Sequence, residues 1–267
     1  MNHIAPQTQR PAGKTNWSKM QGHWVLATLG KRVLRPGGME LTRWMLSKLA
    51  ITSSDDVVEF APGIGATAKE ILAYHPHQYI GIDANPQAVK QLSDQLGSSS
   101  QIFMHQQASD TRLPNDSQNV VVGEAYLTMQ SESEKNKIIL EASRILKSQG
   151  RLGLHELGIV DVDETLSEKI KRELSQTIRV NANPLSQTEW VNLLSTHGFE
   201  ILAQEIRPMD LLRAKRLIQD EGLWGSSKMI FNAMMHPGAM KRALNMRKVF
   251  EKYANHLVGI SIVAKKN

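Results

Sequence analysis

The chain has 267 residues, of which 41% are apolar, and its formal net charge is +6. That length can bury one sizeable hydrophobic core, so we expect a single domain over residues 19–267. Because the chain has no cysteine, disulfides, thiolate metal sites and a cysteine nucleophile are excluded, and we expect a reducing, cytoplasmic location. No apolar run approaches the roughly 18 residues that span a bilayer.

The N-terminal part is expected to hold a tail and two helices. Residues 1–18 are polar, contain two prolines and show no hydrophobic periodicity, which predicts a flexible segment. Apolar patterning predicts helices at about 20–30 and 39–50, and the Pro-Gly-Gly sequence at 36–38 predicts a loop between them.

Three large side chains of this part have two interpretations each. Trp24 and Trp44 are expected to pack these helices, with a contribution to a substrate pocket as the alternative. Arg35 is interpreted as an exposed loop residue, and the alternative is that it binds a carboxylate or a phosphate group.

Residues 57–68 read VVEFAPGIGATA, an apolar run followed by a turn with two glycines. The run predicts a strand buried in a parallel sheet, and the helix formers from Ala66 onward predict a helix after the turn. Gly63 and Gly65 would then stand at a helix N-terminus, whose free N–H groups and partial positive charge suit a ligand. A purely structural glycine turn is the alternative.

A second strand is expected at 79–83 and ends in Asp83. Asn85 and Pro86 have the sequence of a helix start, as N-cap and first helical residue. Asp83 follows Gly63 by about 20 residues, where a carboxylate at the end of a strand can accept hydrogen bonds from two ribose hydroxyls. The spacing therefore predicts a nucleoside ligand.

The rest of the chain continues the alternation of strands and helices, which predicts an α/β fold with a doubly wound, mostly parallel sheet that binds ligands at the carboxyl ends of its strands. Two helix starts, Ser131 with Glu134 and Ser186 with Glu189, have the capping-box pattern. The expected strands lie at 102–106, 119–126, 151–157, 199–206 and 256–266, and the expected helices at 131–147, at 163–178 and from Ser186 onward.

Two kinds of nucleoside-binding protein fit these motifs. Gly63, Gly65, Ala68 and Asp83 match the G-x-G-x-x-G/A fingerprint, which predicts an NAD(P)-linked oxidoreductase. A non-catalytic module that binds a nucleoside for regulation fits them as well.

Further motifs resemble the class I S-adenosylmethionine-dependent methyltransferases, particularly small-molecule enzymes such as the quinone-biosynthesis methyltransferases. An acid followed by glycines stands at 59–65, a Leu-Pro pair at 113–114, and the sequence ASRILKSQGRLGL at 142–154 is similar to the family's helix, turn and fifth strand. The resemblance covers roughly residues 55–160. It implies a Rossmann-like sheet of seven strands with an antiparallel last strand, N-terminal helices and a helical insert before that strand.

The resemblance implies S-adenosyl-L-methionine as the cofactor. Glu59 would orient the methionine amino group, Gly63 and Gly65 would line the cofactor, and Asp83 would hold the ribose. The full set of expected cofactor-binding residues is Glu59, Ala61, Pro62, Gly63, Gly65, Asp83, Ala84, Gln107, Ala108 and Glu124.

The sequence departs from the family pattern at two of these positions. Ala61 replaces the first glycine of the motif, which would narrow the space beside the methionine part of the cofactor. Gln107 stands where the family often has an acid, so Gln107, Ala108, Ser109 or Asp110 would contact the adenine.

Methyl transfer from a cationic sulfonium is an in-line displacement that chiefly needs alignment and exclusion of water, and it needs a base only where the acceptor must lose a proton. The candidate catalytic residues near the strand ends are Glu124, Tyr126, His155 and Glu156. Structural alternatives are a cofactor or backbone contact for Glu124, packing for Tyr126 and a hydrogen-bonded strand-end role for His155. No metal site is expected.

About 50 residues, 207–255, separate the last two expected strands, and so long an insertion predicts a functional element on the catalytic face. The core of the domain would then be 52–206 and 256–267. We expect the insert to be a substrate cap with an apolar acceptor site and a basic rim; packing of the insert onto the sheet is the alternative. The residues concerned are Trp224, Met229, Phe231, Met234, Met235, Met240, Met246, Lys241, Arg242, Arg247 and Lys248.

The expected acceptor is a small, partly apolar molecule, and nucleic acid methylation is the alternative. Basic residues are spread along the chain, which is typical of a solvated surface rather than a nucleic-acid interface. The fourth strand ends in GEAY at 123–126, unlike the N-P-P-Y type of sequence associated with methylation of amino groups of adenine or glutamine. Methylation of pyrimidine C5 through a thiolate is excluded because cysteine is absent.

Overall fold

The structure is a computed structural model that describes residues 17, 19–30, 35–209, 232 and 234–267. The expected flexible segment 1–18 lies almost wholly outside these residues. So do Trp224, Met229 and Phe231 of the expected cap, and the side chain of Trp24 is not described either.

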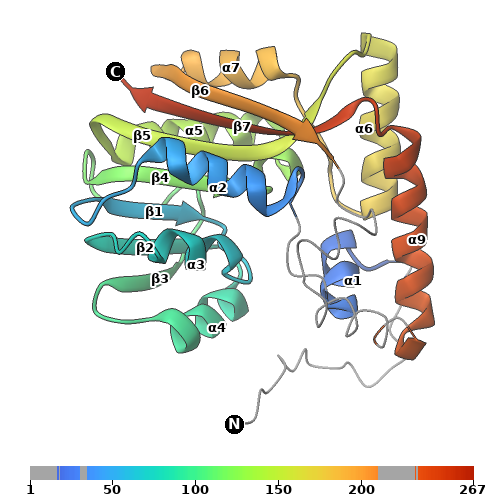
Figure 1. Cartoon of the computed structure of the whole chain (residues 1–267), viewed down its shortest axis with the longest axis horizontal. Helices are drawn as coiled ribbons and strands as arrows, with labels where there is room; N and C mark the ends of the chain where they lie inside the picture. Colours follow the sequence, from blue (N-terminus) through green and yellow to red (C-terminus); the bar gives the residue numbers. More distant parts are fainter. Residues whose placement is uncertain (1–16, 18, 31–34, 210–231, 233) are drawn as a thin grey trace.

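A seven-stranded sheet with the order β3-β2-β1-β4-β5-β7-β6 organises the chain (Figure 1). Neighbouring strands from β3 to β5 pair in parallel, and β7 runs antiparallel between β5 and β6, so the expected doubly wound sheet with an antiparallel last strand is confirmed. The strands are β1 Asp56–Phe60, β2 Gln78–Asp83, β3 Gln101–His105, β4 Gln118–Glu124, β5 Leu146–Ile159, β6 Phe199–Pro208 and β7 Leu257–Lys266.

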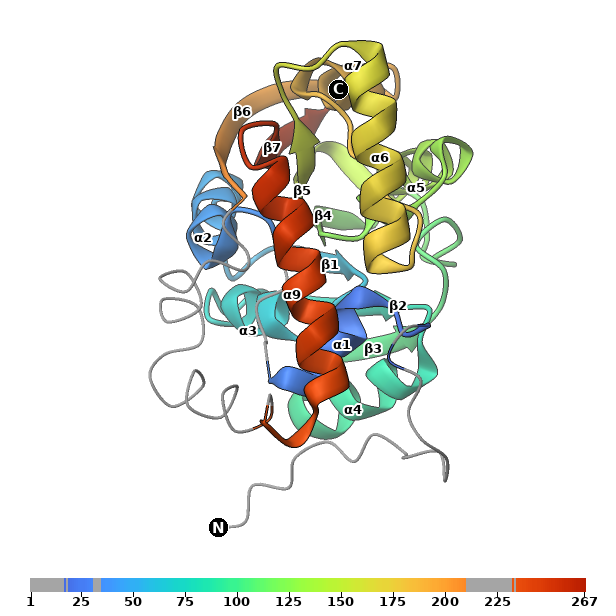
Figure 2. The same ribbon diagram turned by 90° about the vertical axis from the view of Figure 1, so that its right-hand side faces the viewer.

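Helices cover both faces of the sheet, and a third group lies beyond the carboxyl ends of the parallel strands (Figures 1 and 2). One face carries α2 Gly38–Leu49, α3 Ala66–Leu72 and α4 Pro86–Leu96. The other carries α5 Glu132–Ile145 and α7 Gln187–Ser195. The third group consists of α1 Gly22–Leu29, α6 Glu164–Ile178 and α9 Pro237–Lys252, which share a separate hydrophobic cluster.

Alternation along the strands builds the two sheet-facing cores, because successive side chains of a strand point to opposite faces. In β1, Val58 and Phe60 join the cluster under α5 and α7, whereas Val57 joins the cluster under α2, α3 and α4. Trp44 of α2 packs against the latter cluster, as expected. Burial of both faces explains why β1 reads as an apolar run rather than as an alternating pattern.

The helix starts follow the sequence expectations with one difference. The Asn85 side chain accepts a hydrogen bond from the amide of Gln87, and Ser186 forms a complete capping box with Glu189. Ser131 caps α5, but the carboxylate of Glu134 accepts a hydrogen bond from Ser109 at 2.5 Å, so the expected box there is only half formed. The loop after β3 is thereby joined to the start of α5.

The loop between α1 and α2 packs directly on the sheet at Gly259 of β7. A Cβ added to Gly259 would lie 2.7 Å from the carbonyl carbon and oxygen of Pro36 and 2.8 Å from the amide nitrogen of Gly37. Backbone atoms cannot move aside as a flexible side chain can. This glycine therefore allows residues 36–37 to lie against the strand.

Substitution Gly259→Ala is expected to lower the free energy of unfolding by about 2 kcal/mol, because the new methyl group overlaps the Pro36 and Gly37 backbone. Urea unfolding of the variant would measure the loss. Lys48→Ala, at an exposed position of α2, is the control and should change stability little. A Gly259→Ala protein as stable as the native chain would contradict this close approach.

Candidate functional site

The turn after β1 lies at the carboxyl ends of the parallel strands and has three residues with positive φ: Ala61 at 54°, Gly63 at 57° and Gly65 at 78°. The two glycines are needed for different reasons. A Cβ on Gly65 would lie 2.5 Å from Leu92 of α4, so this glycine allows close helix packing. A Cβ on Gly63 would meet only the carbonyl oxygen of Ala61, at 3.9 Å, so Gly63 faces open space. Ala61 keeps the left-handed conformation although it carries a methyl group.

Asp83 joins this turn to the end of β2. Its carboxylate accepts one hydrogen bond from the amide of Gly63 at 3.0 Å and another from the amide of Asn85 at 2.8 Å. The residue is only 8% exposed. Asp83 therefore shapes the turn in addition to any contact with a ligand.

Glu59, at the end of β1, is buried and accepts a hydrogen bond of 2.5 Å from the hydroxyl of Tyr79. Burial raises the pKa of Glu59 to about 8, although the Tyr79 hydrogen bond acts in the opposite direction. The negative charge of Glu124 adds to the rise. The carboxyl group of Glu59 thus holds its proton at a pH where an exposed glutamate is ionised.

Glu124, the last residue of β4, lies within hydrogen-bond distance of side chains from four other residues. Arg35 donates to it at 2.5 Å and Thr42 at 2.6 Å, Thr67 donates through its hydroxyl, and Nδ1 of His155 lies 2.6 Å from it. Burial by itself would raise the pKa of Glu124, but the positive charges of Arg35 and His155 outweigh it and lower the pKa to about 2. Glu124 is therefore an ionised, buried anchor.

The expectation that Arg35 is an exposed loop residue is wrong. Arg35 is 6% exposed, and its guanidinium pairs with Glu124 and donates to Thr42 at 2.8 Å. Close packing of the following residues on Gly259 draws the loop inward, where an arginine must find a carboxylate. Arg35 does bind a carboxylate, but that carboxylate belongs to the protein.

His155 is fully buried in the second half of β5, and both ring nitrogens have partners. Nδ1 faces Glu124, and Nε2 hydrogen-bonds the carbonyl oxygen of Pro36. Both ring nitrogens are therefore engaged within the protein. This geometry is that of the hydrogen-bonded structural histidine rather than of a group open to an acceptor molecule.

Glu156 fixes the turn that follows β4. Its carboxylate accepts from the amides of Tyr126 at 3.0 Å, Leu127 at 2.8 Å and Thr128 at 3.0 Å, and from the Thr128 hydroxyl at 2.7 Å. The carboxylate of Glu156 thus lies at the start of the short helix η1, Leu127–Met129, where a negative charge is favourable. Burial raises the pKa of Glu156 despite these donors.

Tyr126 packs its ring edge-on to Phe60, with ring centroids 6.4 Å apart. The hydroxyl oxygen is buried and has no hydrogen-bond partner in the described part of the chain. Packing, the structural alternative for Tyr126, therefore accounts for its ring and not for its hydroxyl.

Residues 107–110, expected at the adenine, form a turn in which the amide of Asp110 donates to the carbonyl of Gln107 at 3.0 Å. The hydroxyl of Ser109 donates a hydrogen bond to the carboxylate of Glu134, and the carboxylate of the exposed Asp110 lies 3.8 Å from the guanidinium of Arg112. Ala108 packs against the cluster under α5. Of the neighbouring expected residues, Ala84 accepts from His105 at 3.1 Å through its carbonyl, and Pro62 lies over Gly81.

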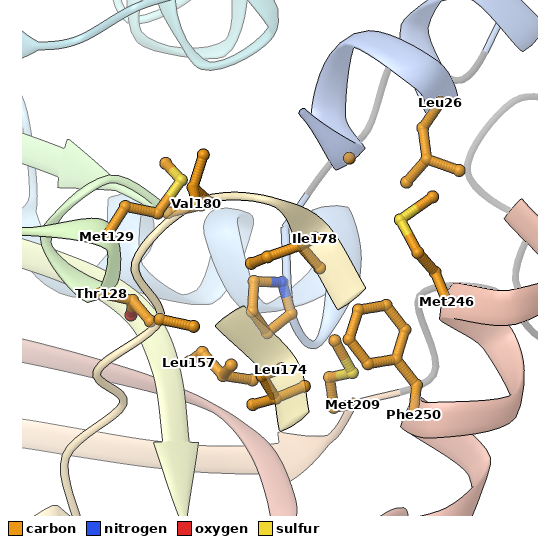
Figure 3. A pocket seen from close by; sticks show the side chains of 14 residues that line it. Leu26, Thr128, Met129, Leu157, Leu174, Ile178, Val180, Met209, Met246 and Phe250 are labelled. Atoms are coloured by element: carbon orange, nitrogen blue, oxygen red, sulfur yellow. The ribbon is translucent and has the colours of Figure 1, made fainter. Parts of the chain in front are cut away.

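A cavity of about 120 Å³ lies beside the turn after β4, and its lining is almost entirely apolar. Figure 3 shows its walls, which come from α1, the turn after β4, β5, α6 and α9. Among the lining side chains are Leu26, Leu157, Ile178, Met209, Met246 and Phe250. Pro36 and Ala125 also line it, so the cavity borders the two residues that directly follow Arg35 and Glu124 in sequence.

The insert contributes to the cavity in part. Met246 and Phe250 of α9 line it. Met234, Met235 and Met240 are instead 69%, 63% and 38% exposed, so within the described residues these three do not form the expected apolar site.

Sequence reasoning missed the walls supplied by α1 and α6. The apolar faces of both helices are visible in their patterns, but a periodic pattern does not say which surface such a face meets. Across the described ranges, no three His, Asp or Glu side chains are grouped so as to hold a metal ion, and none of the helices is long and apolar enough to cross a bilayer.

Comparisons with known proteins include a matching methyltransferase profile and two related sequences. A family profile described as a methyltransferase domain matches residues 57–150. An uncharacterised protein of Haemophilus influenzae is 30% identical over 249 residues, which cover 92% of this chain and 98% of that protein. A protein of Schizosaccharomyces pombe described as an uncharacterised methyltransferase is 27% identical over 177 residues, 61% of this chain and 65% of that protein.

Solved structures share the fold. The S-adenosylmethionine-dependent methyltransferase of Geobacter sulfurreducens, solved with S-adenosyl-L-homocysteine, matches with a TM-score of 0.67 at 14% identity, over 91% of this chain and 98% of that one. The sheet order, the turn after β1 and these similarities point the same way. The chain belongs to the class I S-adenosylmethionine-dependent methyltransferases, and S-adenosylmethionine is its cofactor.

Proposed function

We propose that this enzyme methylates a small acceptor with an apolar body, and that the acceptor binds in the cavity between the turn after β4 and α9. The observation that carries the proposal is the position of that cavity. It is lined by Pro36 and Ala125 at the carboxyl end of β4, and its remaining walls are almost all apolar. A cavity of about 150 Å³ with apolar walls can hold a benzene-sized molecule, so about 120 Å³ suits an aliphatic or a single-ring group.

The turn after β1 fits the cofactor. The open space at Gly63 leaves room for a ligand against the backbone, and the buried carboxyl group of Glu59 lies in the strand just before it. When bound, S-adenosylmethionine supplies a methyl group on a positively charged sulfur. We assign its binding to Glu59, Ala61, Pro62, Gly63, Gly65, Asp83, Ala84, Gln107 and Ala108, with Glu124 acting behind them through its anchoring of the strand end.

The chain's own contribution to methyl transfer is then alignment and exclusion of water. Glu124 and His155 are both buried and have their polar atoms in use. Neither is placed to take a proton from an acceptor. The proposed mechanism therefore uses no protein base, which suits an acceptor atom that already has a free electron pair.

We further propose one domain over residues 19–267, with a core of 52–206 and 256–267 and the insert 207–255 as part of the acceptor site. The contacts of α9 with α1 and α6 support this division, since α9 completes the cavity wall. A nucleic acid acceptor is the second candidate. The apolar lining of the cavity favours a small molecule over it, because nucleic acids are bound chiefly through positively charged surfaces.

The first prediction concerns the cofactor. S-adenosylmethionine and S-adenosylhomocysteine should raise the melting temperature of the chain, whereas NAD and NADP should not; a ligand at 100 times its Kd stabilises by about 2.7 kcal/mol. Asp83→Asn should reduce that stabilisation, because the amide loses the charge offered to the ribose. Asp94→Asn, at an exposed acid paired with Lys90, is the control. Equal stabilisation of both variants would remove Asp83 from the site.

The second prediction concerns the cavity. Met246→Trp should fill the cavity. With S-adenosylmethionine and a protein-free metabolite extract as the source of acceptor, the variant should form S-adenosylhomocysteine about tenfold or more slowly than the native enzyme. Stabilisation by S-adenosylmethionine should be retained. Met240→Trp, on the exposed side of the same helix, should leave turnover unchanged. Undiminished turnover in Met246→Trp, or turnover that depends on added RNA, would contradict the small-molecule assignment.

The third prediction concerns Glu59. Because its pKa is raised to about 8, the folded chain binds more protons than the unfolded chain between the ordinary glutamate pKa and that value. The contribution of Glu59 to the free energy of unfolding therefore falls as pH rises through this window. Glu59→Gln has no such proton to lose, so its stability should decline less between about pH 5 and about pH 8. Urea unfolding at several pH values would measure both proteins. If the free energy of unfolding falls equally with pH in the native chain and in Glu59→Gln, Glu59 is already ionised.

A further inference from the structure

Arg242 is a partly buried cation near one end of the cavity. It lies one helical turn before Met246 on α9, and Met246 lines the cavity. Its Nε atom is buried and has no hydrogen-bond partner in the part of the chain that the structure describes, and its Nη2 atom makes one long bond of 3.4 Å to the carbonyl oxygen of Met20. Arg247 on the same helix differs, since it pairs with Glu251 at 2.7 Å. No carboxylate of the described residues pairs with Arg242.

A second positive charge lies close to Arg242. Burial lowers the pKa of Arg242, and the neighbouring charge of Arg179 lowers it further. Arg179 directly follows Ile178, another residue of the cavity wall, and ends α6 with φ of 61°. Arg179 also has a further interaction of its own.

These groups mark the end of the cavity that is distant from the turn after β4. A Cβ on Gly22 would lie 2.8 Å from Sδ of Met246 and 3.2 Å from Cβ of Ile178, so α1, α6 and α9 converge here. Figure 3 shows Met246 on the opposite side of the cavity from Thr128 and Met129. Arg242 therefore stands beside the end that Met246 lines.

We propose that Arg242 binds an anionic group of the methyl acceptor, a carboxylate or a phosphate, while the apolar body of the acceptor occupies the cavity. This inference rests on the proposed function. It gives the acceptor a direction, since an anion at the Arg242 end leaves the rest of the molecule pointing toward Ala125 and Pro36 at the end of β4. A guanidinium matches both anions because its planar donors bind two oxygens at once.

The alternative is that Arg242 is held only by the Met20 carbonyl. Against it, that bond is long, and it leaves Nε without an acceptor among the described residues. An anion at this position would supply a hydrogen-bond acceptor for Nε and would pair with the guanidinium charge. The charge pairing favours the anion over a neutral group of the same shape.

The test uses the full chain saturated with S-adenosylhomocysteine and four probes with the same apolar body: 3-phenylpropionate, 2-phenylethylphosphonate, 3-phenylpropan-1-ol and 3-phenylpropylamine. Their Kd values would be measured by calorimetry. The native chain should bind at least one anion about tenfold or more tightly than the alcohol, and the amine most weakly. The tighter of the two anions tells a carboxylate acceptor from a phosphate acceptor.

Variants locate the effect. Arg242→Gln should abolish the preference for the anion while binding of the alcohol is kept, Arg242→Lys should restore part of it, and Arg247→Gln should leave it intact. Equal binding of anion and alcohol by the native chain, or a preference that survives Arg242→Gln, would overturn the inference. Melting curves with S-adenosylhomocysteine separate this failure from that of the proposed function: a cofactor product that stabilises the chain leaves the methyltransferase assignment standing even if no anion is preferred.

Discussion

The carboxylate of Glu124 is the contact on which the geometry of the site depends. A buried charge is tolerated only when it is paired and hydrogen-bonded, and here Arg35, Thr42, Thr67 and His155 supply the donors. These partners come from the loop before α2, from α2, from α3 and from β5. Removing one partner of such a buried pair costs about 3–5 kcal/mol, so the anchor holds all of these elements in one arrangement.

The same anchor shapes the acceptor cavity. Pro36 and Ala125 are the sequence neighbours of Arg35 and Glu124, and both line it. The three residues after Ala125 donate their amides to the carboxylate of Glu156. This wall of the cavity is therefore held in place by two buried carboxylates, Glu124 and Glu156. Neither carboxylate is open to an acceptor. Acidic residues at strand ends thus contribute here by fixing positions, which is the chief requirement of an in-line methyl transfer.

Local signals predicted what depends on local structure. The glycine turn, the end of β2 at Asp83 and the N-caps Asn85 and Ser186 follow from residue type and spacing, and the structure has them. Arg35 could not be placed in this way. Its burial depends on Gly259, more than 200 residues later in sequence, and on a carboxylate at the end of another strand. The cavity was missed for the same reason, because α1, α6 and α9 meet only in the folded chain.

Apolar walls bring affinity but little direction, because the hydrophobic effect follows the area removed from water and not its orientation. Methyl transfer is sensitive to direction, since the accepting atom must approach along one line. The orientation of the acceptor must therefore come from polar groups at the ends of the cavity. Thr128, whose hydroxyl already donates to Glu156, lies at one end, and Arg242, whose Nε has no acceptor among the described residues, lies beside the other. A charge at the end of the cavity distant from β4 fixes the orientation of the acceptor molecule. It does so without taking up space at the other end, where the methyl group is transferred.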